Sequence, residues 1–431
     1  MKSDKFSIRT SVDELEISPT LAINEQVRNA RKHGKQILHL GFGQSPFPVH
    51  PAIQKALCAN ADKSMYLPSA GLPELRLLAR DYYAEQARFD ADKFEAIIGP
   101  GSKELIFDVQ LAVEGDLLLP IPSWVSYAPQ ALLINDRVVK IPTTIADNYH
   151  ITAESLEGAI LGAREQGKNP QKLIIDYPNN PSGLTMGQDR LEKIARVCKR
   201  YGILVISDEI YGLLNYQQDH SSMARFYPEG TIMTSGLSKH LSLGGYRLGV
   251  AIVPKGQRPI FDAVIRMASL TWSTVSAPVQ FAALEAFRND PGVQEYIQTC
   301  TRIYRLVADF VRDTVVALGL EYPDLEGAFY LYPDFEPFRK KLQVYGVQTS
   351  DQLASDLIDR IQLATLPGTA FGDEPERLRL RLASCDFDGQ AALDYYASHP
   401  DCTSESLVHA CCPNIRLACE RLGGYFEKLT G

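Results

Sequence analysis

The chain has 431 residues, of which 45% are hydrophobic and 22% charged, and its formal net charge at pH 7 is −8. This composition is typical of a folded globular protein and too apolar for a disordered one, and the length allows one large or two medium domains. The negative net charge argues against nucleic acid as a partner.

No apolar stretch approaches the ~20 residues that a membrane span needs, and residues 1–18 lack the apolar core of a secretory signal. We therefore expect no membrane partner and a cytoplasmic location. The eight cysteines show no paired CxxC spacing. This favours reduced thiols over a disulfide framework or a zinc site, and we expect no metal.

The first predicted elements are a helix and a short strand over residues 17–40. From about residue 94, short apolar runs alternate with longer amphipathic ones. The short runs predict seven strands, at residues 95–98, 116–121, 137–141, 172–177, 203–208, 231–235 and 248–253. Most lack a clean alternation of apolar and polar residues, as expected of strands that helices cover on both faces. The pattern therefore predicts a three-layer α/β domain.

The pattern changes after about residue 285. A long amphipathic stretch over residues 296–318 precedes two short alternating segments, GAFYLYPDF and RLRLRLAS, with a helical stretch between them. Such strands separated by helices predict a smaller α+β domain. We expect residues 46–285 to form the large domain, and residues 1–45 and 286–431 to form the small one.

Four motifs follow predicted strands of the large domain, where open α/β sheets bind their ligands. GPGSKE is a tight turn that opens a helix, whose free N–H groups can bind phosphate. PNNPSG holds two asparagine amides between prolines. In SDEIY, a buried strand ends at Asp208, and a buried carboxylate needs a cation opposite it. Each of these three motifs alone also suits an ordinary turn or helix cap.

The fourth motif places Lys239 directly after a strand and Arg247 eight residues later. A fixed cation nearby lowers the pKa of a lysine amine, as a Schiff-base nucleophile requires, whereas an isolated lysine would be a solvated surface residue. Together the motifs offer an anion site, an amide, a carboxylate with a phenol, and a lysine with an arginine. Pyridoxal 5′-phosphate (PLP) has a chemical group for each of them.

The order and spacing of these motifs resemble the fold-type I PLP-dependent aminotransferases of class I and II, and most closely the aspartate aminotransferase group. The resemblance rests on SMYLPSAGLPELR, Gly-Ser-Lys, PSWVSY, NNPSG, SDEIY, the SK-x7-R spacing and a late Arg-Leu-Ala strand, over roughly residues 17–395. It implies a transaminase that moves an amino group between an L-amino acid and a 2-oxo acid, on a mixed, mostly parallel seven-stranded sheet. A same-fold PLP lyase, such as a C–S lyase or an aminocyclopropane carboxylate synthase, shares the cofactor residues and stays an alternative.

The resemblance also implies roles for single residues. Lys239 resembles the Schiff-base lysine and general base, and Asp208 resembles the partner of the pyridine nitrogen. Tyr211 and Asn180 resemble the two donors to the phenolic oxygen, and Trp124 resembles the indole stacked on the ring. These are the residues that we expect to hold and activate the cofactor's ring.

The phosphate cradle of the family has counterparts at Gly101, Ser102, Lys103, Arg247 and either Ser235 or Ser238. The two serines stay open because Gly236 stands where the family often has Ser or Thr. Tyr66 resembles the tyrosine that reaches the phosphate in the partner subunit's site. The resemblance therefore implies a homodimer with shared active sites.

The substrate's α-carboxylate should meet an arginine, because a planar guanidinium grips a carboxylate with two hydrogen bonds. In ERLRLRLASC the strand period places Arg377, Arg379 and Arg381 on one face, so periodicity alone does not choose among them. The family pattern of Arg, an aliphatic residue and a small residue fits only Arg381, with Arg379 as the alternative. Gly43, Trp124 and Asn180 complete the expected substrate site, although GFGQSPFP lacks the acidic residue that many relatives have after the glycine.

The choice of amino donor depends on fewer residues. In part of the aspartate aminotransferase group, a lysine at the place of Lys103 meets the donor's second carboxylate, which favours aspartate or another dicarboxylic donor here. Alternatively, Lys103 assists the phosphate or caps the helix, and the enzyme then takes aromatic or aliphatic donors.

Overall fold

The computed structural model describes residues 8–430. Its main sheet has seven strands in the order β2-β8-β7-β6-β5-β3-β4. Their bounds are β2 Phe94–Gly99, β3 Asp116–Ile121, β4 Val138–Pro142, β5 Pro170–Asp176, β6 Leu204–Asp208, β7 Thr231–Gly236 and β8 Gly249–Pro254. Strand β8 runs antiparallel to both of its neighbours, β2 and β7, and all other neighbouring pairs of the sheet are parallel. The seven predicted strands and the mixed, mostly parallel sheet are confirmed.

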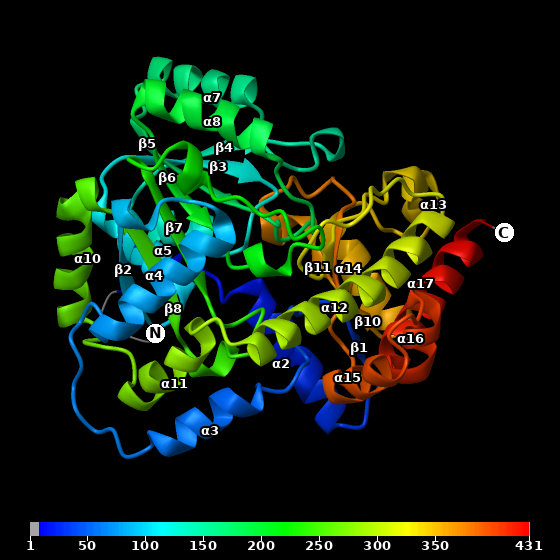
Figure 1. The fold of residues 1–431 in the computed structure, drawn as a ribbon. Helices are drawn as coiled ribbons and strands as arrows, with labels where there is room; N and C mark the ends of the chain where they lie inside the picture. Colours follow the sequence, from blue (N-terminus) through cyan, green and yellow to red (C-terminus); the bar gives the residue numbers. More distant parts are fainter. Residues whose placement is uncertain (1–7, 431) are drawn as a thin grey trace, which may run out of the picture.

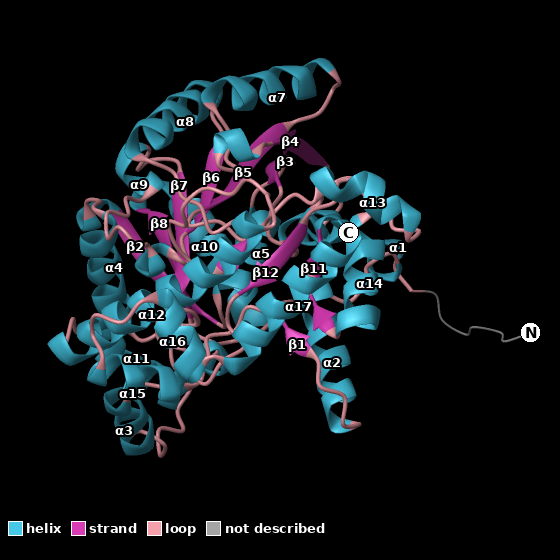
Figure 2. Ribbon diagram, turned by 90° about the vertical axis from the view of Figure 1, so that its right-hand side faces the viewer, coloured by secondary structure: helices cyan, strands magenta, loops and turns pink. Residues whose placement is uncertain are grey.

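Helices cover both faces of this sheet (Figures 1 and 2). Neighbouring strand residues alternate between the two layers: Ile97 packs in one hydrophobic cluster and Ile98 in the other. One layer contains α5 Ser102–Ala112, α6 Tyr127–Leu133 and α10 Arg258–Leu270. The opposite layer contains α3 Pro51–Ala59, α4 Pro73–Ala87, α7 Ala153–Glu165, α8 Gln188–Tyr201, α9 Met223–Phe226 and α11 Ala277–Phe287. The predicted three-layer architecture is therefore confirmed.

The rest of the chain forms a smaller mixed α and β part. It contains a two-stranded sheet of β1 Leu38–His39 and β10 Leu363–Ala364, and a three-stranded sheet of β11 Leu366–Pro367, β12 Leu380–Ala383 and β9 Tyr330–Leu331. Its helices are α1 Thr10–Asp13, α2 Pro19–Lys32, α12 Pro291–Ala317, α13 Arg339–Val344, α14 Ser350–Ile361, α15 Gly389–Ser398, α16 Ser404–Cys411 and α17 Pro413–Thr430. The helix and strand expected over residues 17–40 are α2 and β1.

Helix α12 connects the two parts of the molecule (Figure 1). Its first turns place Val293 and Ile297 in the core beside β2 and β8, whereas Ile303 and Val315 further along pack in the core of the smaller part. Leu38, from β1, joins this second core, so the N-terminal segment packs against the C-terminal one. The division near residue 285 stays a prediction, since one helix belongs to both cores.

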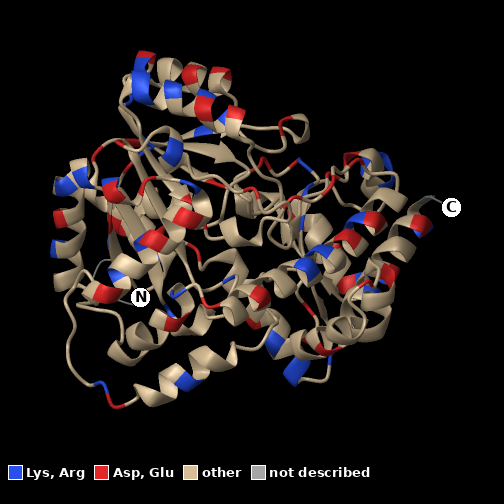
Figure 3. Cartoon of the chain, viewed as in Figure 1, with Lys and Arg blue, Asp and Glu red and all other residues tan. Residues whose placement is uncertain are grey.

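Acidic and basic side chains are intermixed along the outer helices (Figure 3). Within residues 8–430 no helix combines the length and apolarity needed to cross a bilayer. All eight cysteines are free thiols, and the described residues contain no group of three or more His, Cys, Asp or Glu side chains that could hold a metal ion.

Candidate active site

A cavity of about 590 Å³ opens at the edge of the sheet where β2, β5, β6 and β7 end. Its volume is within the range of small-molecule sites. The predicted residues on its wall are Gly43, Ser102, Lys103, Trp124, Asn180, Asp208, Tyr211, Ser238, Lys239, Arg247 and Arg381. The fold thus brings together eleven predicted residues that are spread between positions 43 and 381.

One end of the cavity is built to hold an anion. Helix α5 begins there after Gly101, which has φ of 100°, and no side chain caps the helix's free N–H groups. The Arg247 guanidinium lies against this turn and donates to the carbonyl of Pro100 at 3.1 Å. A Cβ atom on Gly101 would lie 2.3 Å from Arg247 Nη2, so glycine is required for this approach. Free N–H groups beside a guanidinium form a site for phosphate.

The structure distinguishes the two candidate serines. Ser238 lines the cavity, whereas Ser235 is buried at the end of β7 and donates to the backbone carbonyl of Glu209 at 3.3 Å. Of the two serines, only Ser238 is therefore on the cavity wall.

At the far end of the same edge, Asp208 is the last residue of β6. Tyr127 Oη donates to Asp208 Oδ2 at 2.8 Å, and Thr234 Oγ1 donates to Asp208 Oδ1 at 3.3 Å. Burial raises the pKa of Asp208 to about 6, although both hydrogen bonds oppose this shift. Tyr127 was not predicted, even though it stands in the PSWVSY motif. Its hydrogen bond restricts the orientation of the Asp208 carboxyl.

Lys239 lines the same cavity. Its Nζ donates to the carbonyl of Gly43 at 2.9 Å and lies 5.6 Å from the centre of the Tyr211 ring. Burial lowers the pKa of Lys239 to about 8, and the charges of Arg381 and Arg247 act in the same direction, against Cys385 and Asp208. At pH 7 about a tenth of the amine is therefore neutral and nucleophilic, far more than for an ordinary lysine.

Two further residues of the predicted set meet side chains from distant strands. Tyr211 and Tyr330 share a hydrogen bond of 2.8 Å between their hydroxyls, and Asn180 Oδ1 accepts from Arg381 Nη1 at 3.1 Å. A Cβ atom on Gly43 would lie 2.0 Å from the Tyr330 hydroxyl, so glycine is required at 43 as well. Tyr330 was not predicted, because it lies 119 residues from Tyr211 and no motif marks it.

Arg381 is a buried cation without an acidic partner. It is 1% exposed and, within the described part of the chain, has no carboxylate at ion-pair distance. Its Nη2 donates to the carbonyl of Gly41 at 2.7 Å, its Nε has no hydrogen-bond partner, and it packs against the Tyr330 and Phe371 rings. An unpaired buried guanidinium favours binding of a carboxylate.

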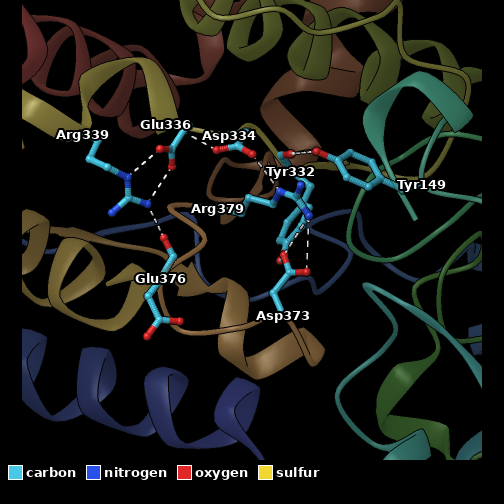
Figure 4. Close-up of polar contacts among 8 residues, drawn as sticks. All are labelled: Tyr149, Tyr332, Asp334, Glu336, Arg339, Asp373, Glu376 and Arg379. Carbon is cyan, nitrogen blue, oxygen red and sulfur yellow. Dashed lines mark hydrogen bonds and ion pairs between the residues drawn. The ribbon is translucent and has the colours of Figure 1, made fainter. Parts of the chain in front are cut away.

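Arg379, two residues earlier, is already neutralised (Figure 4). It forms ion pairs with Asp334 at 2.9 Å and Asp373 at 3.2 Å, and it lies over the Tyr149 ring. Tyr332 donates to the same Asp373 carboxylate at 2.7 Å. Arg377 is exposed. Of the three arginines on the predicted face, only Arg381 reaches the cavity wall.

Lys103 and Trp124 lie together on the wall. The Lys103 Nζ is 5.0 Å from the centre of the Trp124 ring, and no carboxylate among the described residues pairs with it. Burial, followed by the charge of Arg247, lowers the pKa of Lys103. Lys103 is therefore available to pair with an anionic group of a ligand.

The cavity wall lacks one residue that we expected and includes others that we did not expect. Tyr66 is not on the wall of the cavity of its own chain and is 91% exposed. Conversely, Asp176 and the α2 residues Thr20 and Leu21 line the cavity although no prediction included them. The mostly helical N-terminal segment carried no chemical motif that could have placed it there.

Known proteins share this sequence and fold. The family described as aminotransferase class I and II matches residues 35–390. An aspartate aminotransferase of Bacillus sp. (strain YM-2) is 31% identical over 390 residues, which cover 88% of this chain and 95% of the relative. An asparagine–oxo-acid transaminase of Streptococcus mutans is 29% identical and covers 86% of this chain and 93% of the relative. The structure of a Thermus thermophilus aspartate aminotransferase with maleate superposes with a TM-score of 0.81 at 24% identity, over 97% of this chain and 99% of that one, which shows the shared fold.

The chain belongs to the class I and II aminotransferase family. It is a transaminase, which moves an amino group between an amino acid and a 2-oxo acid. The resemblance seen in the sequence motifs is thereby confirmed.

Proposed function

We propose that this aminotransferase uses PLP, held on Lys239, and that it takes a dicarboxylic L-amino acid such as aspartate as donor. One observation supports the cofactor assignment: a single cavity is lined by Lys239, by the start of an uncapped helix with Arg247, and by the buried carboxyl of Asp208. This combination of anion site, amine and carboxyl offers a partner for the phosphate, the aldehyde and the ring nitrogen of PLP. Tyr211 and Asn180 add a hydroxyl and an amide that can donate to the ring's oxygen.

When bound, PLP supplies an aldehyde that links to amines and a ring that accepts electrons from the substrate's α-carbon. The protein's residues do the remaining work. Asp208, oriented by Tyr127, holds a proton on the ring nitrogen. Lys239 Nζ, free once the substrate's amine has replaced it on the cofactor, would accept the α-proton and later return a proton. Arg381 grips the substrate's α-carboxylate and thereby fixes which bond faces Lys239.

The donor assignment depends on Lys103. None of the four cations on the cavity wall, Lys103, Lys239, Arg247 and Arg381, has a carboxylate partner among the described residues. With Lys239 and Arg247 assigned to the cofactor, a ligand with two carboxylates can pair with both Lys103 and Arg381. Names of relatives that mention aspartate, asparagine and prephenate agree with an acidic or amide substrate. A donor with one carboxylate would leave the half-buried Lys103 ammonium unpaired, which is costly.

Tyr66 supports a homodimer with shared sites. Its ring is 91% exposed beside Met65, which is 54% exposed, and neither contributes to the cavity of its own chain. We propose that Tyr66 reaches the anion site of the partner subunit. We also propose a cytoplasmic location, without a nucleic acid or membrane partner.

The test is a donor and acceptor screen of the PLP-loaded protein. We expect aspartate or glutamate to convert the bound cofactor to its amine form at least ten times faster than alanine or leucine does. Turnover should require a 2-oxo acid. A preference for aromatic or aliphatic donors would overturn the donor assignment, and turnover without any acceptor would indicate a lyase instead.

A further inference from the structure

Two buried carboxyl groups stand side by side in the cavity. Asp176 is the last residue of β5 and Asp208 the last of β6, and the two residues are direct partners in the parallel register. Both are nearly inaccessible, at 7% and 4% exposure, and both line the cavity. The mechanism described so far uses only Asp208.

Asp176 is held firmly in place. Its Oδ2 accepts from the backbone N–H of Asn180 at 2.8 Å, and its Oδ1 accepts from Asn179 Nδ2 at 2.9 Å. Asp176 and Asp208 line the same cavity, and the Tyr127 and Tyr330 side chains lie close enough to Asp176 to interact with it electrostatically.

Neither carboxyl forms an ion pair within residues 8–430. Bringing two unpaired negative charges together in a buried site is unfavourable, so such a pair either retains a proton or attracts a cation. In agreement, burial and the nearby Asp208 raise the pKa of Asp176 to about 8, although its hydrogen bonds to Asn180 and Asn179 oppose the shift.

We infer that Asp176 and Asp208 act as a carboxyl pair that selects a positively charged ring nitrogen, with Asp176 acting through Asp208 as a positioning residue. The inference deepens the proposed function and rests on it. A protonated ring nitrogen against Asp208 allows Asp176 to ionise, so binding this cation releases a proton from the pair. The second negative charge strengthens the hold on the protonated ring beyond what Asp208 achieves alone.

The chain offers a matched control for the substitution Asp176→Asn. Asp116, at the start of β3, is also buried, and its carboxylate also accepts two N–H groups, from Arg137 at 3.1 Å and Asn169 at 2.7 Å. It is not on the cavity wall. Asp116→Asn therefore measures how the loss of a buried, hydrogen-bonded carboxylate affects ligand affinity when no second carboxyl of the cavity stands beside it.

The experiment titrates cofactor-free protein with PLP and with its 1-deaza analogue, in which carbon replaces the ring nitrogen. We expect Asp176→Asn to weaken PLP binding about tenfold and to change the affinity for the analogue less than twofold. The control Asp116→Asn should bind both ligands as the wild type does. Equal losses for both ligands would show that Asp176 only holds the Asn179–Asn180 turn, and unchanged affinities would show that its charge has no role. Either result overturns the inference.

A second readout needs no cofactor and separates this inference from the proposed function. Because the folded-state pKa of Asp176 is raised from an unfolded value of about 4, its contribution to stability is lost as pH rises toward about 8. The melting temperature of Asp176→Asn relative to wild type should therefore increase from pH 5 to pH 9. A melting-temperature difference that stays constant with pH would refute the carboxyl pair. If the difference increases with pH but the wild type does not bind PLP, only the proposed cofactor is refuted.

Discussion

Arg381 lies in β12 and Arg379 directly precedes that strand. We expect substitution of Arg381 to weaken substrate binding and substitution of Arg379 to lower the stability of the fold. Arg381→Gln removes the unpaired guanidinium that faces the cavity. Truncating one partner of a buried charge pair costs about 2–5 kcal/mol of binding, which is about 30-fold to a few thousand-fold in affinity for the substrate's carboxylate. The unfolding free energy of the cofactor-free variant should stay within about 1 kcal/mol of wild type, because the loss of two hydrogen bonds is offset by removal of a desolvated charge.

Arg379→Gln instead leaves Asp334 and Asp373 without their cation. Breaking a buried ion pair costs about 3–5 kcal/mol. Since the Asp334 side chain is 28% exposed and that of Asp373 only 8%, we expect the lower end of this range. Calorimetric titration with the preferred 2-oxo acid and denaturant unfolding measure the two quantities, with exposed Arg377→Gln as the control. Loss of affinity in Arg379→Gln together with retained affinity in Arg381→Gln would refute the assignment.

Three other predictions concern the remaining cations and the second subunit. Lys103→Gln should lower kcat/KM for dicarboxylic donors about 30-fold or more, on the order of 2 kcal/mol, and leave kcat/KM for alanine unchanged. Equal losses for all donors would assign Lys103 to the phosphate. Because the pKa of Lys239 is lowered to about 8, the neutral amine becomes more abundant as pH rises through that value. Labelling of Lys239 in the cofactor-free protein by an amine-reactive reagent should therefore have a midpoint near pH 8, and a midpoint above pH 10 would contradict the shift. Mixing inactive Lys239→Ala and Tyr66→Ala proteins should restore part of the activity, since a mixed dimer has one intact site; no recovery after demonstrated subunit exchange would exclude the shared site.

Much of the large domain could be predicted because its strands are buried on both faces. Such strands appear as short apolar runs bounded by polar or glycine residues, and each predicted strand lies within two residues of its observed position. The rule that ligands bind at the carboxyl ends of parallel strands then predicts that Asp208, Asn180 and Lys239 belong to one site. The structure confirms that these three side chains line one cavity.

The residues that escaped prediction depend on contacts between distant segments. Tyr330 reaches Tyr211 only because β9 and β12 pair and lie beside the main sheet, and no local pattern encodes that approach. The choice between Arg379 and Arg381 likewise depends on packing, since strand alternation treats them alike while Asp373 neutralises only Arg379. Asp176 was overlooked because its partnership with Asp208 depends on the register of β5 and β6.

The most direct test of the account is to locate the cofactor on the chain. PLP-loaded protein is reduced with borohydride and digested, and the modified peptide is identified by mass spectrometry. We predict one modified peptide, with the cofactor attached to Lys239, and none in Lys239→Ala. Attachment to another lysine, or wild-type protein that cannot be loaded with PLP, would contradict the proposed active site.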